Sequence, residues 1–161
     1  MAVNTGDKMP EGSFAIMTSE GPGALSSKDL FEGKTVVVFS VPGAFTPACS
    51  SQHLPGYIAN AQAIKAKGVD TIACMSVNDV FVMDAWAKDQ GAGDQVLLLA
   101  DGNADYVKSL GLQLDASGFG MGTRGERFAI VVKNGVVEQL HREAAASDVK
   151  ESSAENILAS L

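Results

Sequence analysis

The sequence predicts an α/β fold in which a central mixed, mostly parallel sheet is flanked by helices. Short apolar runs bounded by glycine or proline alternate along the chain with longer stretches in which apolar residues recur every three or four positions, as strands and helices do. The strand-like runs are apolar almost throughout, which is typical of parallel strands covered on both faces. Near the C-terminal end, Asn134-Gly135 separates two further apolar runs and predicts a hairpin that adds an antiparallel edge.

The first predicted strand covers residues 34–41, and the loop after it runs into a helix. Apolar residues at helical spacing continue this helix until Gly68, and Pro55 should kink or interrupt it near its first turns. Residues 69–77 predict a second buried strand, which contains Cys74.

The same alternation continues in the second half of the chain. Asp79 is suited to cap a helix that Gly91 closes. Residues 95–100 predict a third buried strand, and residues 104–110 predict a short helix after it.

The C-terminal part of the chain predicts a hairpin and a last helix. The hairpin pairs residues 127–133 with residues 135–140 through the Asn134-Gly135 turn. Ser152 is followed three residues later by Glu155, a spacing that predicts a capping box at the start of the final helix.

The size and composition favour one folded domain over residues 1–161. A chain of this length can bury a core without disulfide or metal staples. A hydrophobic content of 46% with 19% charged residues indicates a compact protein and excludes a disordered one. No repeat, low-complexity tract or linker divides the sequence.

The charge and the cysteine content exclude several classes of partner and site. A net charge of −7 disfavours nucleic acid and anionic membrane as partners, and no apolar run approaches the ~20 residues that span a bilayer. The N-terminus has no secretory signal pattern. The 2 cysteines and 2 histidines match no usual zinc spacing, and so few cysteines fit a reducing compartment, so we expect no metal and a cytoplasmic location.

Cys49 is the residue best placed for chemistry. The loop over residues 42–49 follows a predicted parallel strand, which is where ligand sites form in open α/β sheets. Thr46 is a preferred N-cap residue and Pro47 suits the first helical position, so Cys49 falls in the first turn of the helix. The free backbone N–H groups and the helix dipole there favour the thiolate over the thiol.

A thiolate alone explains little of the reactivity that such a site needs. Full ionisation gains roughly thirtyfold in thiolate at neutral pH, and the accompanying fall in nucleophilicity removes about tenfold. Groups that stabilise charge on the leaving atom must supply the rest. The Thr46 hydroxyl and Arg127, which opens an apolar strand, are the best candidates. Arg124 is either a second cation of the site or a partner of Glu126 or Asp115.

Three other features have a plain structural interpretation beside a functional one. His53 follows Cys49 by one helical turn and either pairs with it or, as we favour, packs or hydrogen-bonds locally in the kinked helix. Cys74 reads as a small buried hydrophobic residue. The glycine-rich residues 118–122 lack the context of a phosphate-binding loop and predict a flexible loop near the site.

The pattern Pro42-x-x-x-Thr46-x-x-Cys49 resembles the peroxiredoxin signature, and its surroundings resemble the type II (atypical, redoxin-like) branch of that family. The resemblance covers nearly the whole chain and implies a thioredoxin-like fold. The segments that carry it are residues 41–50, 53–57, 68–79, 127–129 and 152–155.

This resemblance implies a thiol-dependent peroxidase. Cys49 would attack hydrogen peroxide or an alkyl hydroperoxide and become a sulfenic acid, with release of water or an alcohol. Pro42 would shield the pocket, and Thr46 and Arg127 would bind and polarise the peroxide. The chemistry implied needs no metal, haem or flavin cofactor. Dimerisation through a face near the active-site loop is also implied.

The expected route of recycling depends on a departure from the family. Some members resolve the sulfenic acid with a third cysteine near the C-terminus, and residues 147–152 contain none. Either glutathione with glutaredoxin, or thioredoxin, attacks the Cys49 sulfenic acid directly, or Cys74 resolves it. We favour the external thiol, because Cys74 lies within an apolar strand.

Two functions of other kinds remain as alternatives. A cysteine hydrolase would use Cys49 with a histidine base, and a redox-sensing or partner-binding domain would oxidise Cys49 slowly and without turnover. A phosphatase is excluded, because no arginine follows Cys49 in a short phosphate-binding loop.

Overall fold

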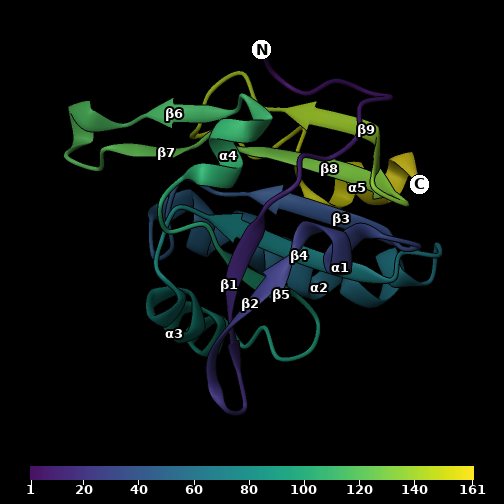
Figure 1. Ribbon diagram of the computed structural model, residues 1–161, viewed down its shortest axis with the longest axis horizontal. Helices are drawn as coiled ribbons and strands as arrows, with labels where there is room; N and C mark the ends of the chain where they lie inside the picture. Colours follow the sequence, from purple (N-terminus) through teal and green to yellow (C-terminus); the bar gives the residue numbers. More distant parts are fainter.

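The computed structural model describes residues 1–161 and is built on a mixed seven-stranded sheet (Figure 1). The strand order is β2-β1-β5-β4-β3-β8-β9. A second sheet pairs only β6 with β7. The strands are β1 (Ser13–Thr18), β2 (Gly21–Ser26), β3 (Thr35–Ser40), β4 (Thr71–Ser76), β5 (Leu97–Ala100), β6 (Gln113–Asp115), β7 (Thr123–Gly125), β8 (Phe128–Lys133) and β9 (Val136–Arg142).

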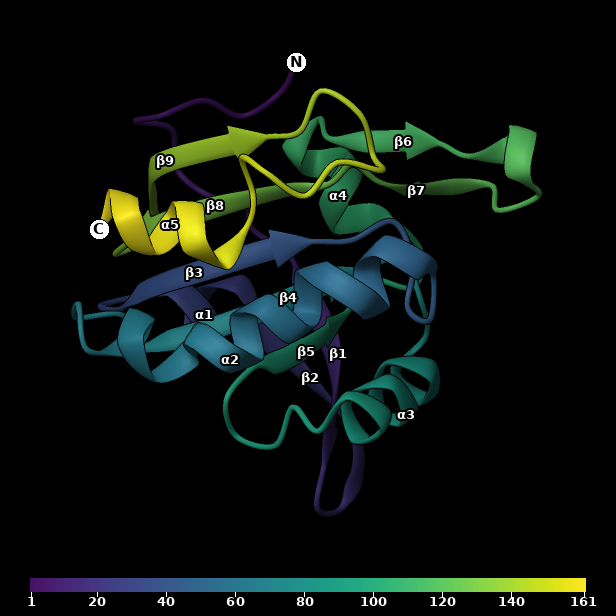
Figure 2. The ribbon, with the colours of Figure 1, turned by 180° about the vertical axis from the view of Figure 1, so that it is seen from behind.

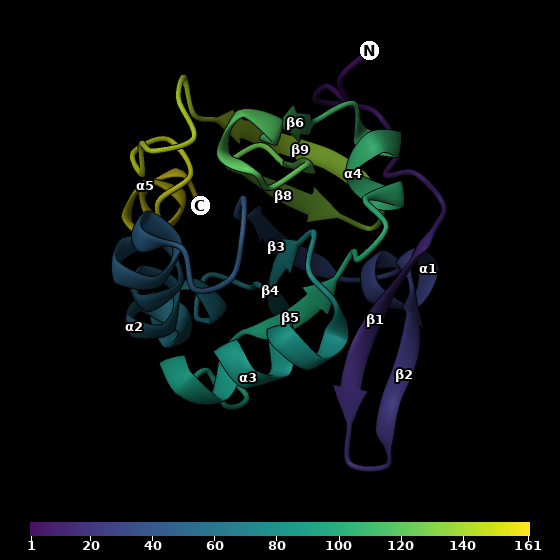
Figure 3. The same ribbon diagram turned by 90° about the vertical axis from the view of Figure 1, so that its left-hand side faces the viewer.

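Helices cover both faces of the large sheet, as predicted. On one face α2, α3 and α5 lie over the sheet, and on the other lie α1 and α4 (Figure 3). Figure 2 shows α2 and α5 side by side in front of the sheet. No helix is both long and apolar enough to cross a bilayer. The helices are α1 (Ser27–Phe31), α2 (Leu54–Lys65), α3 (Val80–Gln90), α4 (Asp105–Leu110) and α5 (Ala154–Ser160).

The sheet is mixed, but less parallel than the sequence predicts. Only β3 with β4 and β4 with β5 pair in parallel, and the other pairings of the large sheet are antiparallel. The difference comes largely from the β1–β2 hairpin, which adds two antiparallel strands beside β5. Both strands are mostly half-buried or exposed, and β2 contains two glycines and a proline in place of the apolar run that marks a buried strand.

The pairing of β3 with β8 determines where the site forms. These strands run antiparallel with Ser40 opposite Phe128, so the start of β8 lies beside the end of β3. Both strands are almost entirely buried, which makes this register hard to shift. Arg127, the residue before β8, therefore meets the loop that leaves β3 and leads to Cys49.

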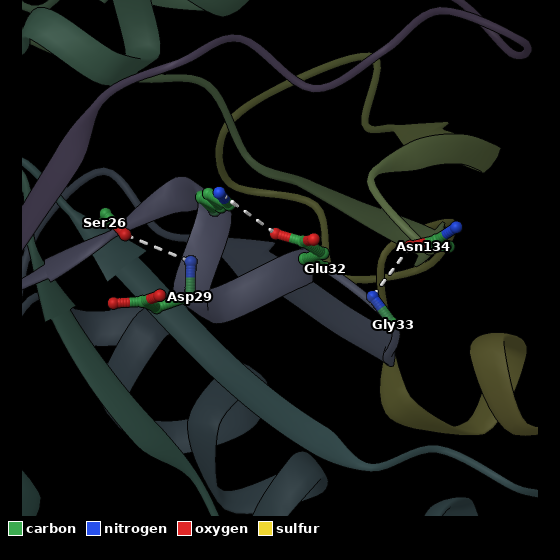
Figure 4. Close-up of polar contacts among 6 residues, drawn as sticks. Ser26, Asp29, Glu32, Gly33 and Asn134 are labelled. Atoms are coloured by element: carbon green, nitrogen blue, oxygen red, sulfur yellow. Dashed lines mark hydrogen bonds and ion pairs between the residues drawn. The ribbon is translucent and has the colours of Figure 1, made fainter.

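The predicted hairpin between β8 and β9 is confirmed. Asn134 and Gly135 have φ values of 47° and 77°, the left-handed conformations that a two-residue turn of this kind requires. The Asn134 side chain also ties this turn to the segment after α1, because its Oδ1 accepts a hydrogen bond of 2.7 Å from Gly33 N (Figure 4). In the same view, Ser26 Oγ accepts from Asp29 N at 3.1 Å and caps α1.

The capping box predicted for the last helix is displaced by one residue. The N-cap of α5 is Ser153, whose Oγ accepts from Asn156 N at 3.2 Å. Ser152 is fully buried, and its hydroxyl donates instead to Glu143. The sequence has two serines in a row, and the first of them does not cap the helix because its hydroxyl bonds to the Glu143 carboxylate. The cap predicted for α3 is confirmed, with Asp79 as N-cap and Gly91 as C-cap.

Candidate active site

Cys49 lies in the first turns of the helical segment that starts at Pro47, as the sequence predicts. The carbonyl of Thr46 accepts from Ser50 N at 2.9 Å, which places Thr46 at the N-cap position. The Cys49 side chain is fully buried. The sulfur therefore sits beneath the surface, close to the free N–H groups of a helix start.

The kink predicted at Pro55 takes the form of a π-helical turn over Cys49–His53. Leu54 N donates to the carbonyl of Cys49, five residues back, in place of the usual four. Proline has no N–H to donate and its ring crowds the carbonyl four residues earlier, so a widened turn before Pro55 relieves both problems. Cys49 and His53, the two ends of this turn, are both buried, and both contact Arg127.

Arg127 binds the sulfur directly. Its Nη2 donates to Cys49 Sγ over 3.0 Å. Its Nη1 contacts His53 Nδ1 at 2.8 Å, and its Nε donates to the carbonyl of Ala146 at 2.7 Å. All three guanidinium nitrogens are thus engaged, and the residue is only 3% exposed. A cation held this rigidly against a sulfur stabilises negative charge on it.

His53 orients Arg127 and does not act as a base for Cys49. Because a guanidinium can only donate, His53 Nδ1 accepts from it, and Nε2 carries the proton and donates to the carbonyl of Ser152 at 3.0 Å. Burial, and then the positive charge of Arg127, lower the pKa of His53 to about 3. The local packing predicted for His53 is confirmed, because its ring lies against Tyr57 of the same helix with a centroid distance of 5.6 Å. Its hydrogen bonds are not local, since Arg127 and Ser152 lie far away in the chain, and it does not pair with Cys49.

The buried His53 predicts a pH dependence of stability. Its pKa falls from 6.5 in the unfolded chain to about 3 in the folded one, so between these values the unfolded chain binds more protons and the free energy of unfolding falls as the pH decreases. Titration of an unfolded-state histidine costs about 2 kcal/mol at pH 5 relative to pH 7. We expect a His53→Gln variant to lose this part of the drop, measured by urea unfolding at both pH values.

The control for this experiment is His141→Gln, because His141 lies on the partly exposed strand β9. This variant should keep the full drop in the free energy of unfolding between pH 7 and pH 5. An equal drop in the wild-type protein and in His53→Gln would contradict a neutral, buried His53.

Three of the four predicted site residues line one cavity of about 350 Å³, namely Pro42, Thr46 and Arg127. The fourth, Cys49, does not line the cavity, but its sulfur contacts Arg127, which does. The structure thus brings all four together. The Thr46 hydroxyl donates to the carbonyl of Gly43 at 2.7 Å, so its proton is committed and its oxygen is free only to accept.

One wall of this cavity is largely apolar. It comes from the β6–β7 hairpin, which projects from the body of the protein (Figures 1 and 2). The glycine-rich residues 118–122 form the tip of this hairpin together with a short 3₁₀ turn, Ser117–Phe119. Their predicted place near the site is confirmed. The side chains that form this wall are Leu114, Ala116, Phe119 and Met121.

Arg124 belongs to neither of its two predicted settings. Its Nε donates to the carbonyl of Met121 at 2.9 Å and its Nη1 to the carbonyl of Val77 at 3.0 Å. Glu126 pairs with Arg142 instead, and Asp115 accepts from Ser117. Arg124 therefore ties the β6–β7 hairpin to the end of β4 and supports the wall of the cavity.

The loop that carries Thr46 is held in a strained conformation. Phe45 has a φ of 64°, which is rare for a bulky residue and costs about 1–3 kcal/mol. Next to it, Ala44 N donates to Asn78 Oδ1 at 3.0 Å. The Phe45 ring packs on Trp86, whose Nε1 donates to Ser50 Oγ at 3.0 Å. The only tryptophan of the chain is thus bonded to the residue after Cys49, and its fluorescence should report on this turn.

Cys74 is fully buried in the middle of β4, paired opposite Phe39 of β3. Burial raises the pKa of its thiol well above the ordinary value, and the neighbouring Cys49 raises it further. A thiol in this state is a poor nucleophile. This agrees with the interpretation of Cys74 as a small buried hydrophobic residue.

Sequence reasoning missed the groups that hold Arg127 and His53. Two of them are backbone carbonyls, of Ala146 and Ser152, and a carbonyl has no signature in a sequence. The third is Glu143, which binds the segment containing Ser152. Only its place three residues after the predicted strand 135–140 could have drawn attention to it.

Comparisons with known proteins show which sequences and structures this chain resembles. A model of the redoxin family matches residues 4–158. The chain is 41% identical to chloroplastic peroxiredoxin-2E of Arabidopsis thaliana over 99% of its length and 70% of that protein. It is 41% identical to peroxiredoxin-2C of the same plant, over 99% of this chain and 98% of that one. The crystal structure of reduced Prx3 of Vibrio vulnificus in complex with hydrogen peroxide superposes with a TM-score of 0.94 at 49% identity, over 98% of each chain.

Proposed function

This chain belongs to the redoxin family and is a thiol-dependent peroxidase of the type II peroxiredoxin branch, and we propose that Cys49 is its peroxidatic cysteine. The observation that carries the proposal is the 3.0 Å contact from Arg127 Nη2 to Cys49 Sγ at the base of a cavity. It joins a nucleophile to a cation that can hold the oxygen that leaves. Peroxide cleavage requires a nucleophile and a group that stabilises the leaving oxygen, and the Arg127 guanidinium contacts the first and can act as the second.

The reaction is a displacement at oxygen. The Cys49 thiolate attacks one peroxide oxygen, the S–O bond forms, and the O–O bond breaks with its electron pair on the departing oxygen. Arg127 donates to that oxygen while its charge develops, and the resulting hydroxide or alkoxide takes up from solvent the proton that the Cys49 thiol released on ionisation, so that water or an alcohol leaves. Thr46 Oγ, whose proton is held by Gly43, accepts the O–H of the peroxide and orients it. Pro42, which is buried, closes the cavity on the side of the loop.

Hydrogen peroxide and organic hydroperoxides both fit this proposal. The Prx3 of Vibrio vulnificus that resembles this chain was solved with hydrogen peroxide. The cavity of about 350 Å³ is wide for that small molecule, and its largely apolar walls suit an alkyl group.

The sulfenic acid is recycled, in this proposal, by an external thiol from glutathione with glutaredoxin or from thioredoxin. The thiol attacks the Cys49 sulfur, water leaves, and a second thiol then reduces the mixed disulfide. The buried Cys74, with its raised pKa, is unsuited to this step. A homodimer through the face near the active-site loop is also part of the proposal. Phe45, Phe81 and Phe119 support it, being 52%, 65% and 86% exposed.

The recycling route gives a testable prediction for a Cys74→Ala variant. We expect turnover of hydrogen peroxide with glutaredoxin and glutathione to stay within about twofold of wild type, because the substitution removes a buried thiol that takes no part. In the wild-type protein, mass spectrometry after one equivalent of peroxide should show a sulfenic acid on Cys49 and a free thiol on Cys74. A Cys49–Cys74 disulfide in the wild-type protein, with turnover lost in the variant, would make Cys74 the resolving thiol.

The hydrolase alternative lacks its base. Both ring nitrogens of His53 are occupied by Arg127 and Ser152, and neither faces the sulfur as an acceptor. The other histidine, His141, lies on β9 and bonds to Gln139. A cysteine hydrolase needs an imidazole to take the thiol proton.

A further inference from the structure

Glu143, directly after β9, gathers four hydrogen bonds on one carboxylate. Its Oε2 accepts from Lys150 N at 2.9 Å, from Ser152 N at 2.7 Å and from Ser152 Oγ at 2.5 Å, and its Oε1 accepts from Glu151 N at 3.2 Å. The residue is only 9% exposed. Burial opposes its ionisation, but the hydrogen bonds outweigh it and hold the pKa of Glu143 below the ordinary value. The carboxylate is therefore ionised at neutral pH.

The segment that Glu143 holds has no regular secondary structure of its own. Residues 143–153 form neither helix nor strand, so their backbone is held by side chains and turns. Two carbonyls of this segment face the site. Ala146 O accepts from Arg127 Nε at 2.7 Å, and Ser152 O accepts from His53 Nε2 at 3.0 Å.

The Ser152 carbonyl has a second donor besides the His53 ring. Tyr57 OH donates to it at 2.7 Å, so both lone pairs of this oxygen are used. The Glu143 backbone N also donates to the carbonyl of Arg127 at 3.1 Å. Glu143 thus touches the main chain of Arg127 through its backbone N–H, and its carboxylate holds residues 150–152, which carry the Ser152 carbonyl that His53 binds.

We propose that Glu143 is a positioning residue for peroxide cleavage, which acts on Cys49 through the Ser152 carbonyl, His53 and Arg127. The inference rests on the proposed function of Cys49 and Arg127. Its physical basis is that a guanidinium stabilises the leaving oxygen only in the correct place, and Arg127 is held there in part by His53, whose ring is oriented by the Ser152 carbonyl of the segment that Glu143 binds. A Glu143→Gln substitution removes the charge and replaces one carboxylate oxygen by an NH2 group. The four donors that bind the carboxylate then have one acceptor fewer, and the segment must rearrange.

The test is a Glu143→Gln variant, alone and combined with Arg127→Ala. The rate constant of Cys49 oxidation by hydrogen peroxide is measured in a single turnover by stopped flow, with Trp86 fluorescence as the signal. We expect Glu143→Gln to slow oxidation about tenfold, because a small displacement of a catalytic group has large effects on rate. In the Arg127→Ala background the same substitution should change the rate by less than about twofold, because its effect passes through Arg127.

The matched control is Asp101→Asn. Asp101 is also a buried carboxylate that accepts from backbone N–H groups, those of Tyr106 and Val107 at 3.0 and 2.9 Å, but these belong to α4 and have no hydrogen bond to Arg127 or His53. Its replacement should lower thermal stability and leave the oxidation rate within about twofold of wild type. A purely structural role of Glu143 predicts the same behaviour for both variants.

The outcomes separate this inference from the proposed function. A wild-type rate in Glu143→Gln, or the same tenfold loss with and without Arg127, overturns the role of Glu143 and leaves Cys49 and Arg127 untouched. A wild-type rate in Arg127→Ala overturns the proposed function itself. If Glu143→Gln fails to fold, Ser152→Ala removes only one donor to the carboxylate, and we expect it to slow oxidation about threefold, again only when Arg127 is present. An unchanged rate there also overturns the inference.

Discussion

A Cys49→Ser variant is expected to lose peroxide turnover completely, with a decrease on the order of 10⁶-fold, as for removal of other enzymatic nucleophiles. A hydroxyl at this position stays protonated and cannot attack the peroxide oxygen. The substitution exchanges sulfur for oxygen at a fully buried position and keeps an acceptor for Arg127 Nη2, so the fold should persist. The measurement is consumption of hydrogen peroxide in the presence of excess thiol reductant, with thermal unfolding followed by circular dichroism.

The Cys74→Ala variant is the matched control for Cys49→Ser, because it removes the only other thiol of the chain. It should turn over peroxide while Cys49→Ser does not. Measurable turnover by a folded Cys49→Ser protein would remove Cys49 from the mechanism. A wild-type protein that forms the Cys49 sulfenic acid once and then stops, although reductant is present, would instead support the redox-sensing alternative.

The residues around Cys49 were predictable because the signals there are local. An N-cap threonine, a proline at the first helical position and a cysteine two residues later need only helix geometry, and the structure has this arrangement. Pro55 also predicted a disturbed helix. That the disturbance is a π turn that points Cys49 and His53 inward depends on packing beneath the helix, which no local rule contains.

The position of Arg127 was predictable only in part. A charged residue directly before a buried strand lies at the end of the sheet, but which end depends on the direction of β8 against β3. The hydrogen-bond partners of Arg127 and Arg124 could not be predicted from the sequence, because most of them are backbone carbonyls. The edge hairpin β1–β2 was not predicted either, because β2 contains two glycines and a proline and has little apolar sequence.

An Arg127→Ala variant should reduce the rate constant of Cys49 oxidation by about 10²-fold or more, by analogy with the loss of one oxyanion-stabilising donor. The substitution removes the donor to Cys49 Sγ and leaves His53 Nδ1 and the carbonyl of Ala146 without a partner. Stability should fall as well, by about 1–3 kcal/mol for each buried acceptor left unpaired. The rate must therefore be measured below the unfolding transition, in a single turnover with hydrogen peroxide.

Two companion variants separate charge from geometry at this position. Arg127→Lys keeps a positive charge, but a single ammonium cannot reach Cys49, His53 and Ala146 with the fixed fork that the three contacts use. We expect its oxidation rate to lie between those of wild type and Arg127→Ala. Arg124→Ala should slow oxidation far less than Arg127→Ala, because Arg124 bonds only to carbonyls. A rate in Arg127→Lys equal to wild type would mean that charge alone suffices, and the ordered acceptors around Arg127 would then have no part in cleaving the peroxide.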